Sequence, residues 1–267
     1  MKVLLTGATG FIGSHLTERL CMVGHDVTCF IRPTSDLQWI RHLPVSYRHD
    51  LADLCQYDVI YHLAGALGRK GLPISAYIEP HINMTRRIIN SMNKHTKFVY
   101  MSSAWVSCPK KSYEFTKLAG EQLLNGTHTI VRPGFVYGPG DFHHLPVFQW
   151  IEKLGRFFPI VGNGKNKVCP TYIDDVINIL IKATGKEGII PIAGEPITMN
   201  EFIWAVADAV GVPRPFIHIP IGPKKDFFAT ERIFPSTKKD TIPLNEGLST
   251  TTDWYKQNNL LVKGGKQ

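Results

Sequence analysis

The stretch MKVLLTGATGFIG, residues 1–13, places Gly7, Gly10 and Gly13 at a spacing of three directly after a short apolar run. The branched apolar side chains from Lys2 to Thr6 predict a buried strand. After the glycines, apolar residues recur at helical spacing as far as Leu20. The segment is therefore predicted to run from strand through tight turn to helix.

Glycines between a strand and a helix suit a ligand that carries phosphate. One glycine permits the tight turn, a second lets backbone N–H groups approach a pyrophosphate, and a third lets the helix pack against the strand. Because this turn opens a strand–helix–strand unit, the pattern predicts dinucleotide binding. The residues expected to contact the cofactor here are Gly7, Thr9, Gly10, Phe11, Ile12 and Gly13.

The rest of the first half repeats the same alternation. Further strands are predicted over residues 26–31, 45–48, 58–63, 97–102 and 127–132, with helices after Pro80 and over residues 113–124. Such alternation predicts an α/β fold in which helices cover both faces of a parallel sheet, the doubly wound Rossmann arrangement.

The composition of the sequence changes after Pro133. Glycines and prolines become frequent there, which indicates a small, loop-rich C-terminal lobe. Helices over 174–183 and 199–210 and a strand over 189–192 suggest a partial return to the main body. We therefore expect residues 1–133 to form an NAD(P)-binding Rossmann domain to which residues 168–195 return. Residues 134–167 and 196–267 are then the substrate-binding lobe.

Composition excludes several classes of function. The chain has 267 residues, 43% of them hydrophobic, which suits a globular protein, and its formal charge of +8 is spread without a dense basic block. We therefore expect no nucleic-acid partner, and the alternative is a cleft whose positive field attracts phosphate-bearing ligands.

Five scattered cysteines fit a reducing compartment, and no apolar run is long enough for a signal peptide or a membrane span, so the expected location is cytoplasmic. The adjacent His143 and His144 lack a third ligand, so no metal site is expected.

The ends of the next strands hold polar residues that a dinucleotide needs. Arg32 follows the second strand, where an arginine accommodates a 2′-phosphate, so NADP is favoured and NAD stays possible. The alternative is an exposed arginine without a ligand, and the nearby Asp36 counts against the preference for NADP, while Ser35 offers a hydroxyl to the phosphate. Asp50 is expected to bind adenine, with an ordinary loop aspartate as the alternative. The remaining residues expected to line this crevice are Leu51, Leu63, Ala64 and Gly65.

A catalytic arrangement is predicted on the fifth strand and the helix after it. Tyr113 and Lys117 lie four residues apart, so both project from one helix face. A free tyrosine has a pKa of about 10, and a nearby lysine cation favours the phenolate and makes the phenol a usable acid or base. Ser103 ends the preceding strand at the rim that also carries the glycine turn, where its hydroxyl can hold a substrate oxygen.

Together these motifs resemble the extended short-chain dehydrogenase/reductase superfamily, which contains NAD(P)-dependent epimerases, dehydratases and reductases. The resemblance is carried by residues 6–13, 62–65, Asn83, 99–104, 113–117 with Glu121, 132–140, 172–176 and 244–248. It implies that Ser103 positions the substrate oxygen, that Tyr113 is the acid/base, and that Lys117 lowers the tyrosine pKa and binds the nicotinamide ribose. Pro133 would then lie against the nicotinamide. It also implies a homodimer through the helices of Asn83 and Tyr113.

Three departures from the family limit the transfer of function. Only ten positions separate Ser103 from Tyr113, the chain is short for the group, and Ser103 is followed by Ala104-Trp105 instead of the Asp-Glu pair of sugar-nucleotide dehydratases. The last departure argues against dehydration. The leading hypothesis is an NADP-preferring oxidoreductase that acts on a carbonyl/alcohol pair, with nucleotide-linked sugars among the candidate small-molecule substrates. The alternatives are an NAD-dependent sugar-nucleotide epimerase and a non-catalytic dinucleotide-binding sensor or scaffold.

Overall fold

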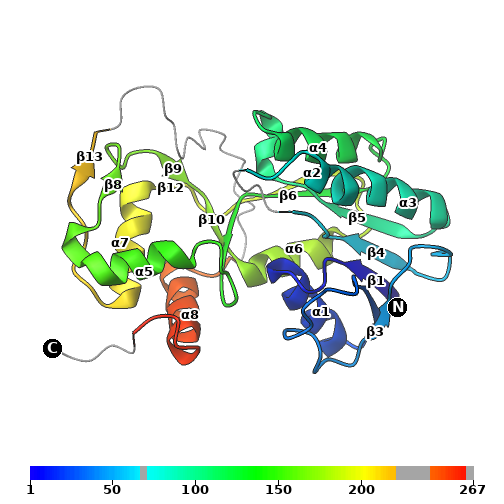
Figure 1. Cartoon of the computed structure of the whole chain (residues 1–267), viewed down its shortest axis with the longest axis horizontal. Coiled ribbons are helices and arrows are strands. Elements are labelled where there is room, and N and C mark those ends of the chain that lie inside the picture. The colour runs from blue at the N-terminus through cyan, green and yellow to red at the C-terminus, as the bar shows by residue number, and fades with distance from the viewer. Residues whose placement is uncertain (67–70, 221–240, 263–267) are drawn as a thin grey trace. The chain divides into compact units, whose positions relative to one another are not determined.

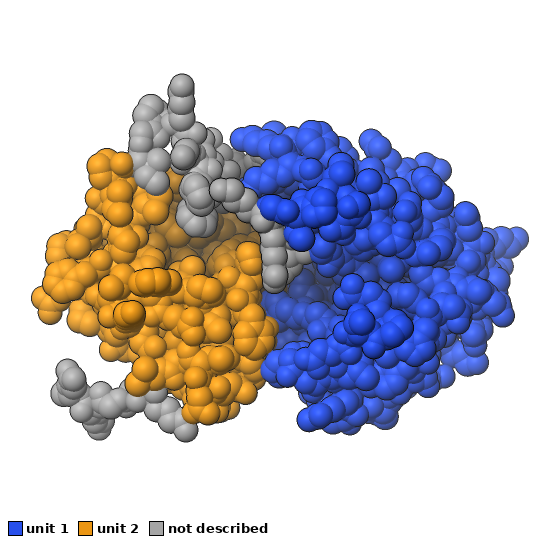
Figure 2. Space-filling model, viewed as in Figure 1, with its two compact units in different colours: residues 1–133, 176–192 blue, residues 134–175, 193–267 orange. Residues whose placement is uncertain are grey.

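A computed structural model describes residues 1–66, 71–220 and 241–262. The chain divides into two compact units, shown in blue and orange in Figure 2. Unit 1 contains Met1–Pro133 and Val176–Ile192, and unit 2 contains Gly134–Asp175 and Ala193–Gln267. The segment that returns to unit 1, Val176–Ile192, lies within the predicted segment 168–195.

Unit 1 is built on a parallel sheet. Its seven strands lie in the order β11-β6-β5-β4-β1-β2-β3, and each pair of neighbours is parallel. The strands are β1 (Lys2–Thr6), β2 (Asp26–Phe30), β3 (Ser46–Arg48), β4 (Val59–His62), β5 (Lys97–Met101), β6 (Thr129–Pro133) and β11 (Gly188–Ile192). Because the order reverses beside β1, the carboxyl ends of β1 and β4 flank the switch point where such sheets bind ligands. The predicted Rossmann-like α/β fold is confirmed.

Helices cover both faces of this sheet. In Figure 1, α1 (Phe11–Met22) lies on one face, and α2 (Ser75–Ile78), α3 (Met84–Ser91) and α4 (Ser112–Gln122) lie on the other. The helix α6 (Ile173–Ala183) is joined to α1 by a 3.0 Å hydrogen bond from Arg19 to Asn178. Strands β1, β4 and β5 are buried along nearly their whole length, as expected between two helical layers.

The helix predicted to begin after Pro80 begins earlier and changes its pitch there. Between α2 and α3, residues Glu79–Asn83 form a π-helical turn that contains Pro80. The N–H of Met84 bonds to the carbonyl of Glu79, five residues back. A proline removes one helical N–H and crowds the preceding turn, and a wider turn accommodates both effects. The helix therefore continues through a residue that the sequence suggested as its start.

Unit 2 is more helical than the sequence indicated. Its helices are α5 (Leu145–Leu154), α7 (Met199–Val210) and α8 (Leu244–Gln257), and α7 packs against the other two. Short strands pair as β7 (Phe135–Tyr137) with β10 (Pro170–Tyr172), β9 (Lys167–Val168) with β12 (Ile197–Thr198), and β8 (Ile160–Val161) with β13 (His218–Ile219). The expectation that glycine and proline interrupt every long element here was wrong for α5. Pro146 lies in its first turn, where a missing N–H costs nothing, and the helix buries Leu145, Phe148 and Ile151.

The helices are too short or too polar for a bilayer. The longest described helix, α8, has 14 residues, fewer than the roughly 20 apolar residues that a span requires. Across the described ranges, the structure contains no helix that qualifies as a membrane span.

A buried ion pair fastens α4 to the sheet. Arg132 on β6 donates two hydrogen bonds to the carboxylate of Glu121 on α4, one from Nε at 2.9 Å and one from a terminal nitrogen at 2.5 Å. The two side chains are only 14% and 5% exposed, so each charge depends on the other for solvation. The same helix carries Tyr113 and Lys117. The ion pair between Arg132 and Glu121 therefore helps to hold both side chains in position relative to the sheet.

Removing one member of this pair leaves a buried charge without a partner. We expect Arg132→Met to lower the free energy of unfolding by about 3–5 kcal/mol, and Arg132→Met combined with Glu121→Met to recover much of that loss. The control is Arg214→Met, because Arg214 makes the same two-bond contact with Asp208 but both side chains are about half exposed. Urea denaturation followed by circular dichroism measures both changes. Equal, small effects of Arg132→Met and Arg214→Met would contradict the assigned role.

Candidate active site

In the glycine turn between β1 and α1, the backbone of one segment packs directly against the backbone of the next. Gly7 has a φ of +77°, and an added Cβ there would lie 2.6 Å from the backbone nitrogen of Ala64. A Cβ on Gly13 would lie 2.0 Å from the carbonyl oxygen of Gly7. These positions therefore exclude every larger residue, and the approach that the sequence predicted is present.

The start of α1 is prepared for an anion. Its N-cap residue, Gly10, provides no side-chain cap, and the first turn contains no acidic residue. The first N–H groups and the positive end of the helix dipole therefore stay available for a phosphate group. Thr9, Phe11 and Ile12 are half-buried beside this turn. The residues present thus fit the pyrophosphate of a dinucleotide.

Thr6 ties the end of β4 to the glycine turn. Its hydroxyl oxygen accepts a 3.2 Å bond from the N–H of Ala64 and lies 2.6 Å from Nδ1 of the buried His62. Its carbonyl accepts from the N–H of Leu63 at 3.1 Å. The segment Leu63–Gly65 therefore runs directly alongside the turn, as the sequence predicted for two neighbouring strand ends.

The segment after β2 folds back on itself. The exposed Arg32 donates its backbone N–H to the Ser35 hydroxyl at 3.0 Å, and the Ser35 N–H returns a 2.9 Å bond to the Arg32 carbonyl. The Arg32 side chain is exposed, so its charge is accessible to a ligand. Asp36, which the sequence left as a competing acidic group, accepts the N–H of Gln38.

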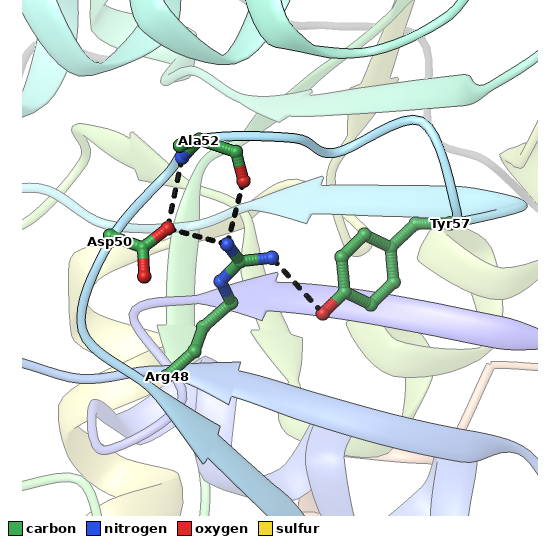
Figure 3. A network of polar contacts seen from close by, with 4 residues as sticks. All are labelled: Arg48, Asp50, Ala52 and Tyr57. Atoms are coloured by element: carbon green, nitrogen blue, oxygen red, sulfur yellow. Dashed lines mark hydrogen bonds and ion pairs between the residues drawn. The ribbon is translucent and has the colours of Figure 1, made fainter.

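The sequence did not single out Arg48, which organises the loop after β3 (Figure 3). Its guanidinium donates to Asp50 at 2.5 Å, to the carbonyl of Ala52 at 2.7 Å and to the hydroxyl of Tyr57 at 3.3 Å. The same Asp50 oxygen accepts the N–H of Ala52 at 3.0 Å. Arg48 thereby lowers the pKa of Asp50, whose side chain is 68% exposed. The side chain of Leu51 is buried in the core, so only its backbone can face a ligand.

Ser103, Tyr113 and Lys117 gather at the carboxyl end of β5. The Ser103 hydroxyl caps a 3₁₀ turn, Ala104–Ser107, by accepting the N–H of Trp105 at 3.3 Å, and it lies close enough to the Tyr113 phenol to act on the pKa of that phenol. This four-residue turn is part of the short connection to α4. All three predicted catalytic residues therefore occupy one region of unit 1, and Pro133 lies buried at the end of β6.

The electrostatics of Tyr113 differ from the expectation. Burial raises its pKa, the bond with Ser103 acts in the opposite direction, and Glu114 and Tyr77 add to the rise. The Lys117 ammonium, which the sequence expected to lower this pKa, donates to the carbonyl of Met101 at 2.6 Å and lies 5.0 Å from the centre of the Tyr100 ring. The phenol is consequently a proton donor at neutral pH.

Lys117 is a buried lysine whose pKa is lower than that of a lysine in water. Only 3% of the residue is exposed, and burial lowers its pKa to about 7, with Glu121 opposing that change. A lysine in this range can be either charged or neutral at physiological pH, unlike one on the surface. The group therefore responds to small changes in its surroundings.

His81 is a second residue that sequence reasoning missed. It is fully buried on the π-helical turn, its ring contacts those of Tyr77 and Tyr113, and burial and the Lys117 charge lower its pKa to about 2. Only its place after Pro80 could have drawn attention to it. In the described chain, no three histidine, cysteine or acidic residues form a metal site.

Comparisons with known proteins agree with this geometry. A plant protein, the chloroplast stem-loop binding protein of 41 kDa b from Arabidopsis thaliana, is 28% identical over 88% of this chain and 69% of its own. The 2-alkyl-3-oxoalkanoate reductase of Stenotrophomonas maltophilia is 28% identical over 80% of this chain and 77% of its own. The solved structure of UDP-glucuronic acid 4-epimerase from Bacillus cereus, in complex with NAD, matches 97% of this chain and 99% of its own with a TM-score of 0.76 and 26% identity.

A family model covers nearly the whole segment that forms the sheet of unit 1. It describes the NAD dependent epimerase/dehydratase family and matches residues 3–191, which include the glycine turn and Ser103, Tyr113 and Lys117. The chain therefore belongs to the NAD dependent epimerase/dehydratase family.

Proposed function

We propose that the chain is an NAD(P)-dependent reductase that reduces a carbonyl group on a small molecule, with nucleotide-linked sugars as the substrate class. The observation that carries this proposal is the gathering of Ser103, Tyr113 and the buried Lys117 at the carboxyl end of β5, the same edge of the sheet that carries the glycine turn. Family membership and the sugar-nucleotide enzymes among its structural neighbours support the substrate class.

Residues of unit 1 would hold the cofactor along the carboxyl edge of the sheet. The turn from Gly7 to Gly13 would bind the pyrophosphate through backbone N–H groups, and Asp50 would accept from the adenine amino group. Lys117 would contact the nicotinamide ribose, and Pro133 would lie against the nicotinamide. When bound, the nicotinamide supplies or accepts the hydride.

The protonation state of Tyr113 favours the reductive direction. Its raised pKa keeps the phenol protonated at neutral pH, so it can deliver a proton to the oxygen of a carbonyl group as that oxygen gains negative charge. The Ser103 hydroxyl would hold the same oxygen, and Lys117 would stabilise the phenolate left behind through its charge. Unit 2, with its three helices and short strands, would supply substrate contacts.

Arg32 supports NADP as the preferred cofactor. Its guanidinium is exposed beyond β2, where a 2′-phosphate would lie, and the Ser35 hydroxyl is close to its backbone. NAD is the alternative, because the Bacillus cereus epimerase structure contains NAD.

The same site could serve a sugar-nucleotide epimerase, the function of that Bacillus cereus relative. An epimerase oxidises and re-reduces one substrate and consumes no cofactor, whereas a reductase oxidises one NAD(P)H for each product molecule. Absorbance at 340 nm during turnover of nucleotide-linked ketosugars and sugars separates the two functions. A protein that binds the dinucleotide and turns over neither substrate class would support the third hypothesis, a non-catalytic sensor or scaffold.

Three expectations about partners and location stay proposals. Paired helices α3 and α4 would form a homodimer, and Phe115, 54% exposed on α4, is a candidate contact. Asn83 instead bonds to Glu79 within the π-helical turn. We expect a cytoplasmic location and no nucleic-acid partner, the latter testable with a stem-loop RNA because one relative is named for that activity.

The first functional prediction concerns Tyr113. Tyr113→Phe removes the transferable proton but little cofactor contact, so turnover should fall about 10²–10⁴-fold while NAD(P)H affinity stays close to wild type. Tyr47→Phe, which removes the hydroxyl of a partly exposed tyrosine on β3, is the control and should change neither quantity. Initial rates and NAD(P)H fluorescence titrations measure the two effects. A variant that retains more than about a tenth of the rate would disprove the role of Tyr113.

The second concerns Arg32 and the choice of cofactor. Charge-assisted bonds to a 2′-phosphate should disappear in Arg32→Ala, which should weaken NADPH binding about ten- to a hundredfold and change NADH binding little. Arg41→Ala is the control, because Arg41 is an exposed arginine in the segment before β3. Calorimetric titration of each protein with both cofactors decides the matter. An equal loss for the two cofactors, or tighter wild-type binding of NADH, would remove Arg32 from phosphate recognition.

A further inference from the structure

The buried His81 has one ring nitrogen paired and one unpaired. Its Nδ1 lies 2.9 Å from the hydroxyl oxygen of Thr116, and Nε2 is buried without a hydrogen-bond partner in the described chain. The Thr116 hydroxyl donates its own proton to the carbonyl of Ser112 at 2.8 Å or to that of Tyr113 at 3.0 Å. When Thr116 donates to either carbonyl it accepts from His81, and this arrangement places the imidazole proton on Nδ1 and a lone pair on Nε2.

That lone pair faces the region of Lys117. An ideal Cβ on Gly65 would lie 3.0 Å from Nε2 of His81 and 3.3 Å from Nζ of Lys117, so both nitrogens border the same point beside Gly65. An ammonium group has three N–H donors, and among the described residues the Lys117 ammonium donates one hydrogen bond, to the carbonyl of Met101. The buried Nε2 of His81, an acceptor without a donor, therefore lies near the buried Lys117 ammonium, which has further N–H groups to donate.

The surrounding structure holds His81 in this orientation. Its carbonyl accepts from the hydroxyl of Thr85 at 2.8 Å and from that of Tyr100 at 3.5 Å, and its ring lies between those of Tyr77 and Tyr113. The π-helical turn that begins at Glu79 carries the residue. The position is thus fixed by the fold, and the ring cannot rotate away without losing the Thr116 bond.

We propose that His81 is a positioning residue that keeps Lys117 protonated: its uncharged Nε2 lone pair stabilises the ammonium across Gly65. An acceptor dipole aimed at a cation favours the charged form, and here it opposes the burial that disfavours it. The mechanistic consequence rests on the proposed function, because a protonated Lys117 is what stabilises the Tyr113 phenolate. The placement of both nitrogens beside Gly65 does not depend on that function.

Other ionisable groups also face Lys117 and must be considered in any test. They are Tyr113 and Glu121 on α4, Tyr100 on β5, and His62 on β4. Glu121 favours the ammonium, and His62 remains uncharged because burial lowers its pKa to about 3. None of these groups is itself replaced by a substitution at His81 or Gly65, and all of them remain in each variant.

The test is a direct titration of Lys117 by NMR in protein labelled with ¹³C,¹⁵N-lysine, without cofactor. Lys117→Arg identifies the signal. His81→Phe keeps an aromatic ring but removes the lone pair, and it should lower the pKa of Lys117 by about 1, as expected for the loss of one hydrogen-bond acceptor. His81→Gln keeps an acceptor at the position of Nε2 and should leave the pKa near its wild-type value of about 7.

Gly65→Ala provides an independent variant, because its methyl group would separate the two nitrogens while leaving His81 intact. It should lower the pKa of Lys117 as His81→Phe does, and the double variant should lower it no further. Thermal unfolding shows that each variant is folded. An unchanged Lys117 pKa in both His81→Phe and Gly65→Ala would overturn the proposal. Failure of the enzyme to reduce any carbonyl substrate would overturn the proposed function and leave this titration unaffected.

Discussion

The close packing of backbone at the glycine turn is the constraint on which the rest of unit 1 depends. With Gly13 pressed against the carbonyl of Gly7, and Gly7 against the backbone of Ala64, α1 begins immediately beside the ends of β1 and β4. Thr6 closes the same junction through its bonds to Ala64 and His62. A single Cβ at this point would push the helix from the strand. The first N–H groups of α1 would then no longer lie beside the carboxyl ends of β1 and β4, at the switch point of the sheet.

Parallel topology then decides which side chains meet. Because neighbouring strands run in one direction, the residues that follow β2, β3, β4 and β5 all reach the same edge. Arg32, Asp50, Gly65 and Ser103 lie there although they are far apart in the sequence. Helix α4 adds Tyr113 and Lys117, and the buried pair of Glu121 and Arg132 sets its position.

The elements with strong local signals were predicted well, and those decided by tertiary contacts were not. Strands β1 to β6 begin and end within two residues of their predicted bounds, because apolar runs bounded by polar or glycine residues mark buried strands. Helix α5 was missed because Pro146 and the surrounding glycines suggested a loop, although Leu145, Phe148 and Ile151 repeat every three residues. The π-helical turn was missed because nothing local distinguishes it from an interrupted helix. Arg48 and His81 matter through partners distant along the chain, so single-sequence reasoning had no signal for them.

The central claim is that the site of unit 1 transfers hydride to a carbonyl group with Tyr113 as proton donor. Mass spectrometry of products formed from nucleotide-linked ketosugars and NAD(P)H carrying deuterium at both C4 positions of the nicotinamide tests it most directly. The account predicts one deuterium in each alcohol product of the wild-type protein and almost no product with Tyr113→Phe. Products that lack deuterium, formed by wild-type protein that binds the labelled cofactor, would contradict it.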